Sequence, residues 1–171
     1  LMGINDSHKV YRGQVYRLVV AQFLHVNMLH LISNVLILLL LVSRLEYTFG
    51  KLRVLIVYIL SGIAGCIFSD LLYTDQMLKA GSSTSLYGMI GLSIGYIIVN
   101  WPSFRRIGFI FKFKIIFVVV LLAAFLLLFS DVAQDVDYMG HLGAFTAGFF
   151  LISMVPSIQN EPREICLRVI F

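Results

Sequence analysis

An all-α bundle of transmembrane helices is the fold class that this sequence predicts, and three observations indicate it. Of the 171 residues, 60% are hydrophobic and only 13% are charged, with a mean hydropathy of +0.94. Five windows contain no Asp, Glu, Lys or Arg, namely residues 18–43, 54–69, 80–104, 115–130 and 138–160. Each is close to the roughly 17–25 residues that a helix needs to cross a bilayer. The windows lack the alternation typical of barrel strands, so we expect five membrane helices in one domain.

The charged residues between the windows predict the orientation of the bundle. Basic residues gather in two connecting turns, and acidic residues gather in the other two, one of which is an outer loop that contains Asp70 and Lys79. By the positive-inside rule the basic turns face the cytosol, including the first, which holds Arg44, Lys51 and Arg53. These basic residues are divided among helix ends and form no stripe interleaved with aromatic side chains. Nucleic acid is therefore not expected as a partner.

The first window carries three polar side chains, His25, His30 and Asn34. Because His30 and Asn34 are four residues apart, they lie on one face of a helix and can donate hydrogen bonds to one point. Ionisable and polar groups inside a membrane are costly and tend to face cavities or partners. The alternative, left open by these residues alone, is that they only link neighbouring helices by hydrogen bonds.

The third window begins with a polar run, Gly81-Ser82-Ser83-Thr84-Ser85, at the start of an apolar helix. A helix N-terminus offers backbone N–H groups and the positive end of the dipole, which suit the stabilisation of an oxyanion. A nucleophilic serine would generate such an oxyanion during acyl transfer. The alternative is that these residues merely cap the helix, as serine and threonine often do.

The last two windows differ in their small residues. The window 115–130 has no glycine, which is typical of a lipid-facing, weakly packed helix, and we regard it as a candidate lateral gate. The last window carries His141 near its outer end, at the same membrane depth as Ser83. Small residues on both helices predict a close crossing that brings Ser83 to His141; they are Gly88, Gly91 and Gly95 on one and Gly140, Ala144 and Gly148 on the other.

Three motifs in this order resemble the rhomboid family of intramembrane serine proteases. They are His25-x-x-x-x-His30-x-x-x-Asn34, Gly81-x-Ser83 and His141-x-Gly-x-x-x-x-Gly148. Further similarities are Tyr16-Arg17 before the first helix, Glu46-x-x-x-Gly50 after it, and Tyr87 one turn below Ser83. The resemblance covers residues 12–156.

The resemblance implies an architecture for the chain. The family core has six helices, and this sequence resembles helices two to six, so we expect the first helix upstream. Residues 1–19 then form an outer membrane-associated loop, residues 20–156 form the protease core, and residues 157–171 form a cytosolic C-terminal segment.

The resemblance also implies roles for individual residues. Ser83 is expected to attack the peptide carbonyl, and His141 to accept and return the proton. His30 and Asn34 are expected to hold the oxyanion. Supporting roles are expected for Tyr87, His25 and Gly81. This is a dyad that needs no cofactor and no metal, and its expected substrates are single-pass transmembrane proteins within the lipid bilayer.

Two residues depart from the pattern of many family members. Thr84 stands where glycine often follows the nucleophile, and Gly140 stands where alanine usually precedes the histidine. Thr84 is expected to narrow the oxyanion pocket or bond a backbone carbonyl, and Gly140 to loosen the turn that aims the imidazole. The acidic residues Asp131, Asp135 and Asp137 are interpreted as a solvated outer loop without a catalytic role.

Two other functions compete with proteolysis. A rhomboid relative without activity would bind membrane clients for trafficking or degradation, but such proteins generally lack the serine or the histidine. A transporter or channel fragment would line a permeation path with His30, Asn34 and His141, although no inverted repeat supports it. We expect a multi-pass protein of the secretory pathway or plasma membrane, with the mitochondrial inner membrane as the alternative.

Overall fold

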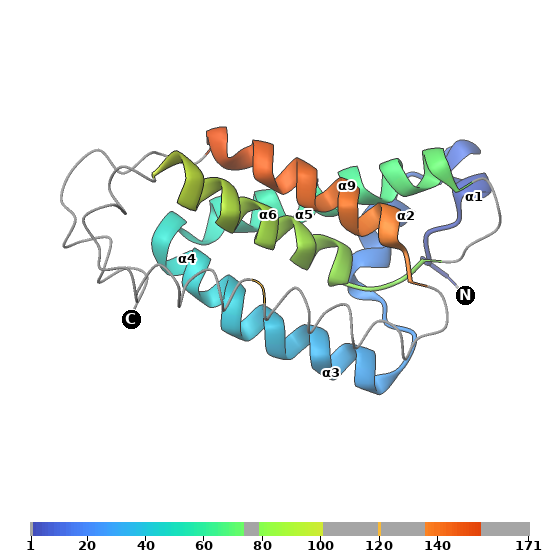
Figure 1. Cartoon of the computed structure of the whole chain (residues 1–171). Helices are drawn as coiled ribbons and strands as arrows, with labels where there is room; N and C mark the ends of the chain where they lie inside the picture. The colour runs from blue at the N-terminus through green and yellow to red at the C-terminus, as the bar shows by residue number, and fades with distance from the viewer. Residues whose placement is uncertain (1, 74–78, 101–119, 121–135, 155–171) are drawn as a thin grey trace.

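The computed structural model describes residues 2–73, 79–100, 120 and 136–154 of the chain. Within these residues the secondary structure is helical apart from one antiparallel bridge between Asn5 and Lys79. The long helices lie side by side, with α3 and α4 along one edge of the view in Figure 1. The elements in chain order are α1 (Ser7–Tyr11), α2 (Arg17–Val20), η1 (Ala21–Phe23), α3 (Met28–Ile37), η2 (Leu38–Val42), α4 (Ser43–Phe49), α5 (Lys51–Leu72), α6 (Ser83–Val99), α9 (Tyr138–Phe150) and η3 (Leu151–Met154).

Two helices of the described chain are long and apolar enough to cross a membrane. The first runs without interruption from α3 through the π-helical turn η2 to the end of α4, as Met28–Phe49, and the second is α5. Each has 22 residues. Gly50 joins them with φ +87°, a backbone conformation that glycine adopts without strain. The apolar helix α6 is shorter, with 17 residues.

The start of the first membrane helix differs from the prediction. The uncharged window 18–43 predicted a helix that includes His25, but the short helices α2 and η1 end at Phe23, and a new helix begins at Met28. Asn27 has extended backbone, and its side chain accepts a hydrogen bond from the N–H of His30 at 2.8 Å. This side-chain cap stabilises a fresh helix start, which a hydropathy window does not register. The helix predicted over 115–130 lies outside the described residues, apart from Val120.

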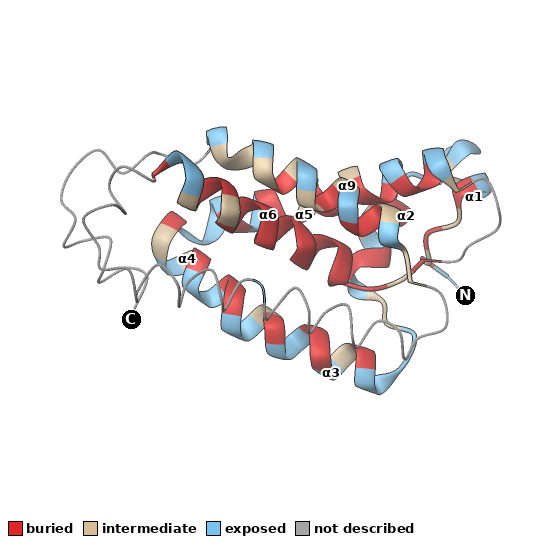
Figure 2. Ribbon diagram, in the orientation of Figure 1, coloured by how far each residue is buried: buried red, intermediate tan, exposed pale blue. Residues whose placement is uncertain are grey.

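Helix α6 occupies the centre of the bundle, and its first eleven residues are all buried (Figure 2). It packs extensively on α5 and α9, and glycines make this possible. A side chain added at Gly148 of α9 would overlap the carbonyl oxygen of Gly88, and one at Gly91 would overlap the carbonyl oxygen of Phe145. The close crossing predicted from small residues is therefore confirmed.

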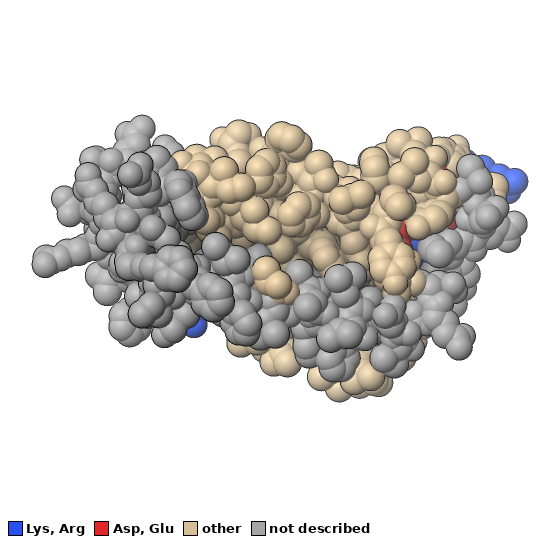
Figure 3. Space-filling model, viewed as in Figure 1, with Lys and Arg blue, Asp and Glu red and all other residues tan. Residues whose placement is uncertain are grey.

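Helix α3 has the reverse polarity of a helix in a water-soluble protein. Its polar residues His30, Ser33 and Asn34 are buried, while Met28 and Ile32 on the outer face are 69% and 58% exposed. In water this arrangement would leave apolar side chains hydrated, so it indicates a lipid surrounding. The space-filling view agrees, because the middle of its described surface has no charged side chains and the visible ones lie toward the ends (Figure 3).

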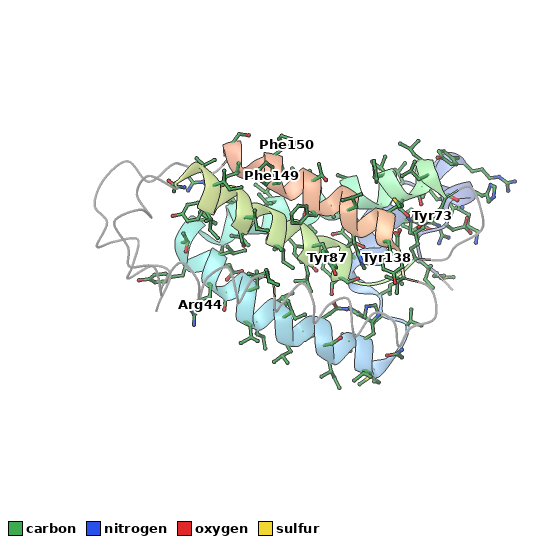
Figure 4. The ribbon with its side chains drawn as sticks, in the orientation of Figure 1. Arg44, Tyr73, Tyr87, Tyr138, Phe149 and Phe150 are labelled. Carbon is green, nitrogen blue, oxygen red and sulfur yellow. The ribbon has the colours of Figure 1, made fainter. Side chains whose placement is uncertain are left out.

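The two ends of the bundle carry different side chains. Arg44 lies at the end opposite to Tyr73 and Tyr138 (Figure 4). Close to Tyr73, the buried carboxylate of Asp70 forms an ion pair with Lys79, with Nζ and Oδ1 2.8 Å apart. The sequence placed both residues in an outer loop, but Asp70 belongs to α5 and neither side chain is solvated. The orientation of the bundle across the membrane stays a prediction.

Candidate active site

A serine and a histidine from two neighbouring helices meet inside the bundle. Ser83 is the first residue of α6, and His141 lies in the first turn of α9. The Oγ atom of Ser83 and the Nε2 atom of His141 are 3.1 Å apart, and the two residues are 7% and 6% exposed. With the imidazole protonated on Nδ1, the serine hydroxyl donates to Nε2, which is the arrangement a general base needs to accept its proton.

The positions of these two side chains follow from how their helices pack. Helices α6 and α9 run in the same direction, and the glycine contacts at Gly91 and Gly148 hold their backbones close together. Both helices begin at the same end of the bundle (Figure 1). Residues in the first turns of the two helices therefore lie at the same level, and their side chains span the remaining gap.

Tyr87 stacks on one face of the His141 ring. The two rings are stacked, with centroids 4.4 Å apart and an angle of 21° between their planes. Tyr87 lies one helical turn after Ser83 on the same helix, so it reaches the same face of α6. It projects from α6 near the start of α9 (Figure 4). An offset stack of this kind limits rotation of the imidazole and favours the orientation that points Nε2 at Ser83.

The serines around Ser83 do not cap the helix. Ser82 occupies the cap position of α6, yet its side chain makes no capping hydrogen bond. Its Oγ lies 3.1 Å from Nε2 of His25, and the hydroxyl of Ser85 donates to Oε1 of Gln22 at 2.7 Å. The capping interpretation of this polar run is therefore wrong for these side chains, because each of them contacts another segment of the chain.

Gly81 brings the backbone before α6 against His30. Its φ is +146°, a backbone conformation that residues other than glycine rarely adopt. A Cβ added to Gly81 would lie 2.7 Å from Cε1 of His30. This Cβ position is 3.1 Å from Nε2 of His30 and 3.4 Å from Oγ of Ser83. The His30 ring and the Ser83 hydroxyl therefore flank one small space that a larger residue at position 81 would fill.

Two of the buried polar residues of α3, His30 and Asn34, have side-chain atoms without a hydrogen-bond partner among the described residues. Among the described residues, neither the amide nitrogen nor the amide oxygen of Asn34 has a partner, and the same holds for Nδ1 of His30. Asn34 is only 1% exposed. Buried polar groups are almost always satisfied, and an exception calls for an explanation such as a catalytic role. These atoms remain available to a ligand or a reaction intermediate.

His25 lies in the loop between Phe23 and α3. Its ring meets the ring of His30 edge to face, with centroids 5.3 Å apart. Burial lowers the pKa of His25, and a hydrogen bond with the backbone of Phe23 offsets only part of this shift. A neutral imidazole is therefore the form that contacts Ser82 at neutral pH.

The structure shows what surrounds Thr84 and Gly140, the two residues that depart from the family pattern. The methyl carbon of Thr84 points at α5, where an added Cβ on Gly65 would lie 2.6 Å from it. This places the Thr84 methyl on a different side of α6 from Gly81 and His30. Gly140 makes room for the carboxylate of Asp137, which an added Cβ would overlap. The absence of a side chain at Gly140 thus accommodates a cap and does not simply loosen the turn.

Asp137 and its partner Ser69 were missed by the sequence interpretation. Asp137 was assigned to a solvated loop, but it caps α9, where its Oδ1 accepts from the N–H of Gly140 at 2.8 Å. The same oxygen accepts from the hydroxyl of Ser69 in α5. An Asp immediately before an apolar helix is a recognised N-cap signal and would have identified the first contact. No local signal points to Ser69.

Fold and site together define a helical membrane protein with a buried serine and histidine in contact and with unsatisfied polar groups on α3. Residues 12–157 match the Rhomboid domain, and the chain belongs to the rhomboid family. It is 30% identical over 161 residues to RHOMBOID-like protein 7 of Arabidopsis thaliana, covering 92% of this chain and 49% of that protein.

Two relatives from Toxoplasma gondii bear the word protease in their names. The chain is 32% identical over 147 residues to Rhomboid-like protease 1, covering 86% of this chain and 49% of that protein. It is 34% identical over 173 residues to Rhomboid-like protease 3, covering 100% of this chain and 63% of that protein. The chain thus spans about half the length of the curated relatives it matches.

Proposed function

We propose that this protein is an intramembrane serine protease that hydrolyses peptide bonds in or near transmembrane helices of other membrane proteins. The observation that carries the proposal is the 3.1 Å separation of Ser83 Oγ and His141 Nε2 inside an apolar bundle. A serine needs a base within hydrogen-bond reach to act as a nucleophile, and among the described residues His141 is the histidine that is hydrogen-bonded to Ser83.

The proposed reaction begins with attack of Ser83 on the scissile carbonyl while Nε2 of His141 accepts the hydroxyl proton. His141 then donates that proton to the leaving amine, and water later hydrolyses the acyl-enzyme by the same route. Tyr87 keeps the imidazole in place through both steps. The dyad works without a carboxylate in contact with His141, whose Nδ1 has no partner among the described residues.

The negative charge that develops on the carbonyl oxygen needs donors at a fixed position. His30 flanks the space beside Ser83, and the amide of Asn34 is buried one helical turn further along α3 with its N–H groups unengaged. The N-terminus of α6 adds backbone N–H groups and the positive end of its dipole. One such donor contributes about 3 kcal/mol to transition-state stabilisation.

The substrate class follows from where the site lies. Ser83 and His141 lie at the end of the bundle at which α6 and α9 begin, so the outer part of a single transmembrane helix is the proposed substrate. Small residues are expected around the cleaved bond because the space between Gly81 and His30 is narrow.

The test is cleavage of a fluorogenic transmembrane peptide in liposomes by the full-length protein. Ser83→Ala and His141→Ala are expected to abolish cleavage. Ser93→Ala and His8→Ala are the matched controls, because among the described residues Ser93 bonds the carbonyl of Met89 within α6 and His8 is exposed on α1. Both controls are expected to keep wild-type rates.

Equal cleavage by Ser83→Ala would refute the proposal. So would a wild-type protein that is folded and yet cleaves none of a panel of helices containing small residues near their outer ends. In that event binding of membrane clients without proteolysis becomes the leading function, and pull-down of the intact panel helices by wild-type protein would measure it.

A further inference from the structure

Two consecutive residues at the end of α5, Ser69 and Asp70, contact the two segments that carry the proposed dyad. Both are buried, at 0% and 5% exposure. Neither residue belongs to the sequence motifs of the site, and neither touches Ser83 or His141. Ser69 bonds to the start of α9, and Asp70 bonds to the segment that precedes α6.

The contact of Ser69 reaches His141 through Asp137. The hydroxyl of Ser69 donates to Oδ1 of Asp137 at 2.5 Å, and this oxygen also accepts from the N–H of Gly140. The carbonyl oxygen of Asp137 accepts from the N–H of His141 at 3.0 Å. Ser69 therefore holds Asp137, the residue that caps the first turn of α9. Because His141 lies in that turn, Ser69 also affects the position of the imidazole.

The contact of Asp70 reaches Ser83 through Lys79. Its Oδ1 lies 2.8 Å from Nζ of Lys79 and 3.0 Å from Nδ2 of Asn5. Asn5 and Lys79 also exchange two backbone hydrogen bonds, of 2.9 and 3.0 Å. Lys79 precedes Ser83 by four residues, so this cluster fixes the chain immediately before the turn at Gly81.

We propose that Ser69 and Asp70 are positioning residues that set the distance between Ser83 and His141. The inference rests on the proposed function and deepens it. Because the two residues are adjacent on one rigid helix, the segments bonded to them are held in a fixed relation to each other. Loss of either contact lets one of the dyad segments shift without removing any group that reacts, and a shift of about 1 Å can slow a reaction about 100-fold.

The experiment measures the rate at which a fluorophosphonate labels Ser83 in the full-length protein, together with kcat and KM for a cleaved transmembrane peptide. Ser69→Ala is compared with Ser61→Ala, which also removes a buried hydroxyl from α5. Among the described residues this hydroxyl bonds within its own helix, to the carbonyl of Tyr58. We expect Ser69→Ala to lower the labelling rate and kcat at least about tenfold with KM unchanged. Ser61→Ala is expected to retain wild-type values.

Three further variants separate positioning from charge and from loss of folding. Asp137→Asn keeps an oxygen that accepts from Ser69 and Gly140, so it is expected to retain the wild-type rate, whereas Asp137→Ala is expected to behave like Ser69→Ala. Asp70→Asn combined with Lys79→Met removes both charges together, so no unpaired charge remains buried and the protein is expected to fold. This double variant is expected to label slowly with KM unchanged.

The outcomes distinguish this inference from the proposed function. A wild-type protein whose Ser83 is not labelled overturns the protease itself. A labelled wild type with Ser69→Ala and the Asp70/Lys79 double variant at wild-type rates overturns the positioning role alone. A fall in rate that is equal for Ser61→Ala and Ser69→Ala, measured well below the thermal midpoint of each variant, also overturns it, because general loosening of α5 would then be the cause.

Discussion

Helices α6 and α3 both supply residues to the candidate site, yet they are held in opposite ways. Helix α6 is buried on every side in its first eleven residues and is packed against α5 and α9 through backbone contacts at glycines. Helix α3 buries one polar face and exposes an apolar face, and it touches α6 at few places. The position of α6 is therefore set by close backbone packing, while the orientation of α3 is set by which of its faces is polar.

The packed helices α5, α6 and α9 and the polar face of α3 therefore have different roles. The glycine contacts of α5, α6 and α9 hold together the helices that carry Ser83 and His141. Helix α3 contributes polar groups that are buried without partners among the described residues, so these groups add little to folding. Substitutions in the packed region should therefore reduce stability, and substitutions on the polar face of α3 should reduce activity with little loss of stability.

The largest expected effect is that of Gly148→Val in the packed region. An added Cβ would overlap the carbonyl oxygen of Gly88 and lie 2.6 Å from its carbonyl carbon, so the two backbones must separate. We expect a loss of about 3 kcal/mol or more in the free energy of unfolding, together with loss of activity. Thermal unfolding in detergent measures it, with Thr146→Val on the exposed face of α9 as control. An unchanged midpoint for Gly148→Val would show that the two helices are not in contact.

The second prediction concerns Asn34→Ala on the polar face of α3. Removal of one oxyanion donor is expected to lower kcat about 100- to 1,000-fold, because the donor acts only in the transition state. The thermal midpoint should stay the same or rise, since the amide has no partner among the described residues. A parallel loss of stability would indicate that Asn34 links helices and does not serve the reaction.

Gly81→Ala lies where the two regions meet and is expected to have an intermediate effect. Alanine must adopt a φ of +146° or push the ring of His30 away, because its Cβ would lie 2.7 Å from Cε1. We expect a cost of about 1–3 kcal/mol, shared between stability and catalysis. Gly13→Ala is the control, because Gly13 also has a positive φ, of +95°, but has open space around its Cβ position. Equal activity of the two variants would mean that contact with His30 is unimportant.

The smallest expected effect comes from Tyr87. Tyr87→Phe keeps the ring stacked on His141 and should retain the wild-type kcat, whereas Tyr87→Leu loses the stack. A stacked pair is worth about 0.5–1.5 kcal/mol, so the expected fall in kcat for Tyr87→Leu is up to about tenfold. If Tyr87→Phe were as slow as Tyr87→Leu, the hydroxyl and not the stack would be the important group.

The sequence predicts those parts of the structure that depend on local chemistry. Uncharged windows locate α5, α6 and α9, and small residues four apart predict the crossing that brings the first turns of α6 and α9 together. The same windows fail at residues 18–27, because the hydrogen bond from the Asn27 side chain starts a new helix inside an apolar stretch. Hydropathy measures solvent preference and carries no information about such a cap.

Contacts between polar residues that are far apart in the sequence could not be predicted from the sequence. Gln22 pairs with Ser85, Ser69 with Asp137, and Asp70 with Lys79. None of these pairs has a spacing that distinguishes it from a chance combination, because the partners meet only once the helices are packed. Asp70 was therefore assigned to an outer loop and Asp137 to a solvated one, although both are engaged with side chains of other segments.

The most direct test of the central claim is covalent labelling of the full-length membrane protein with a fluorophosphonate, followed by mass spectrometry of its peptides. The account predicts that the label is found on Ser83, that labelling is lost in His141→Ala, and that Ser93→Ala labels like the wild type. Labelling of Ser83 at an undiminished rate in His141→Ala, or a folded wild type in which Ser83 stays unlabelled, would contradict it.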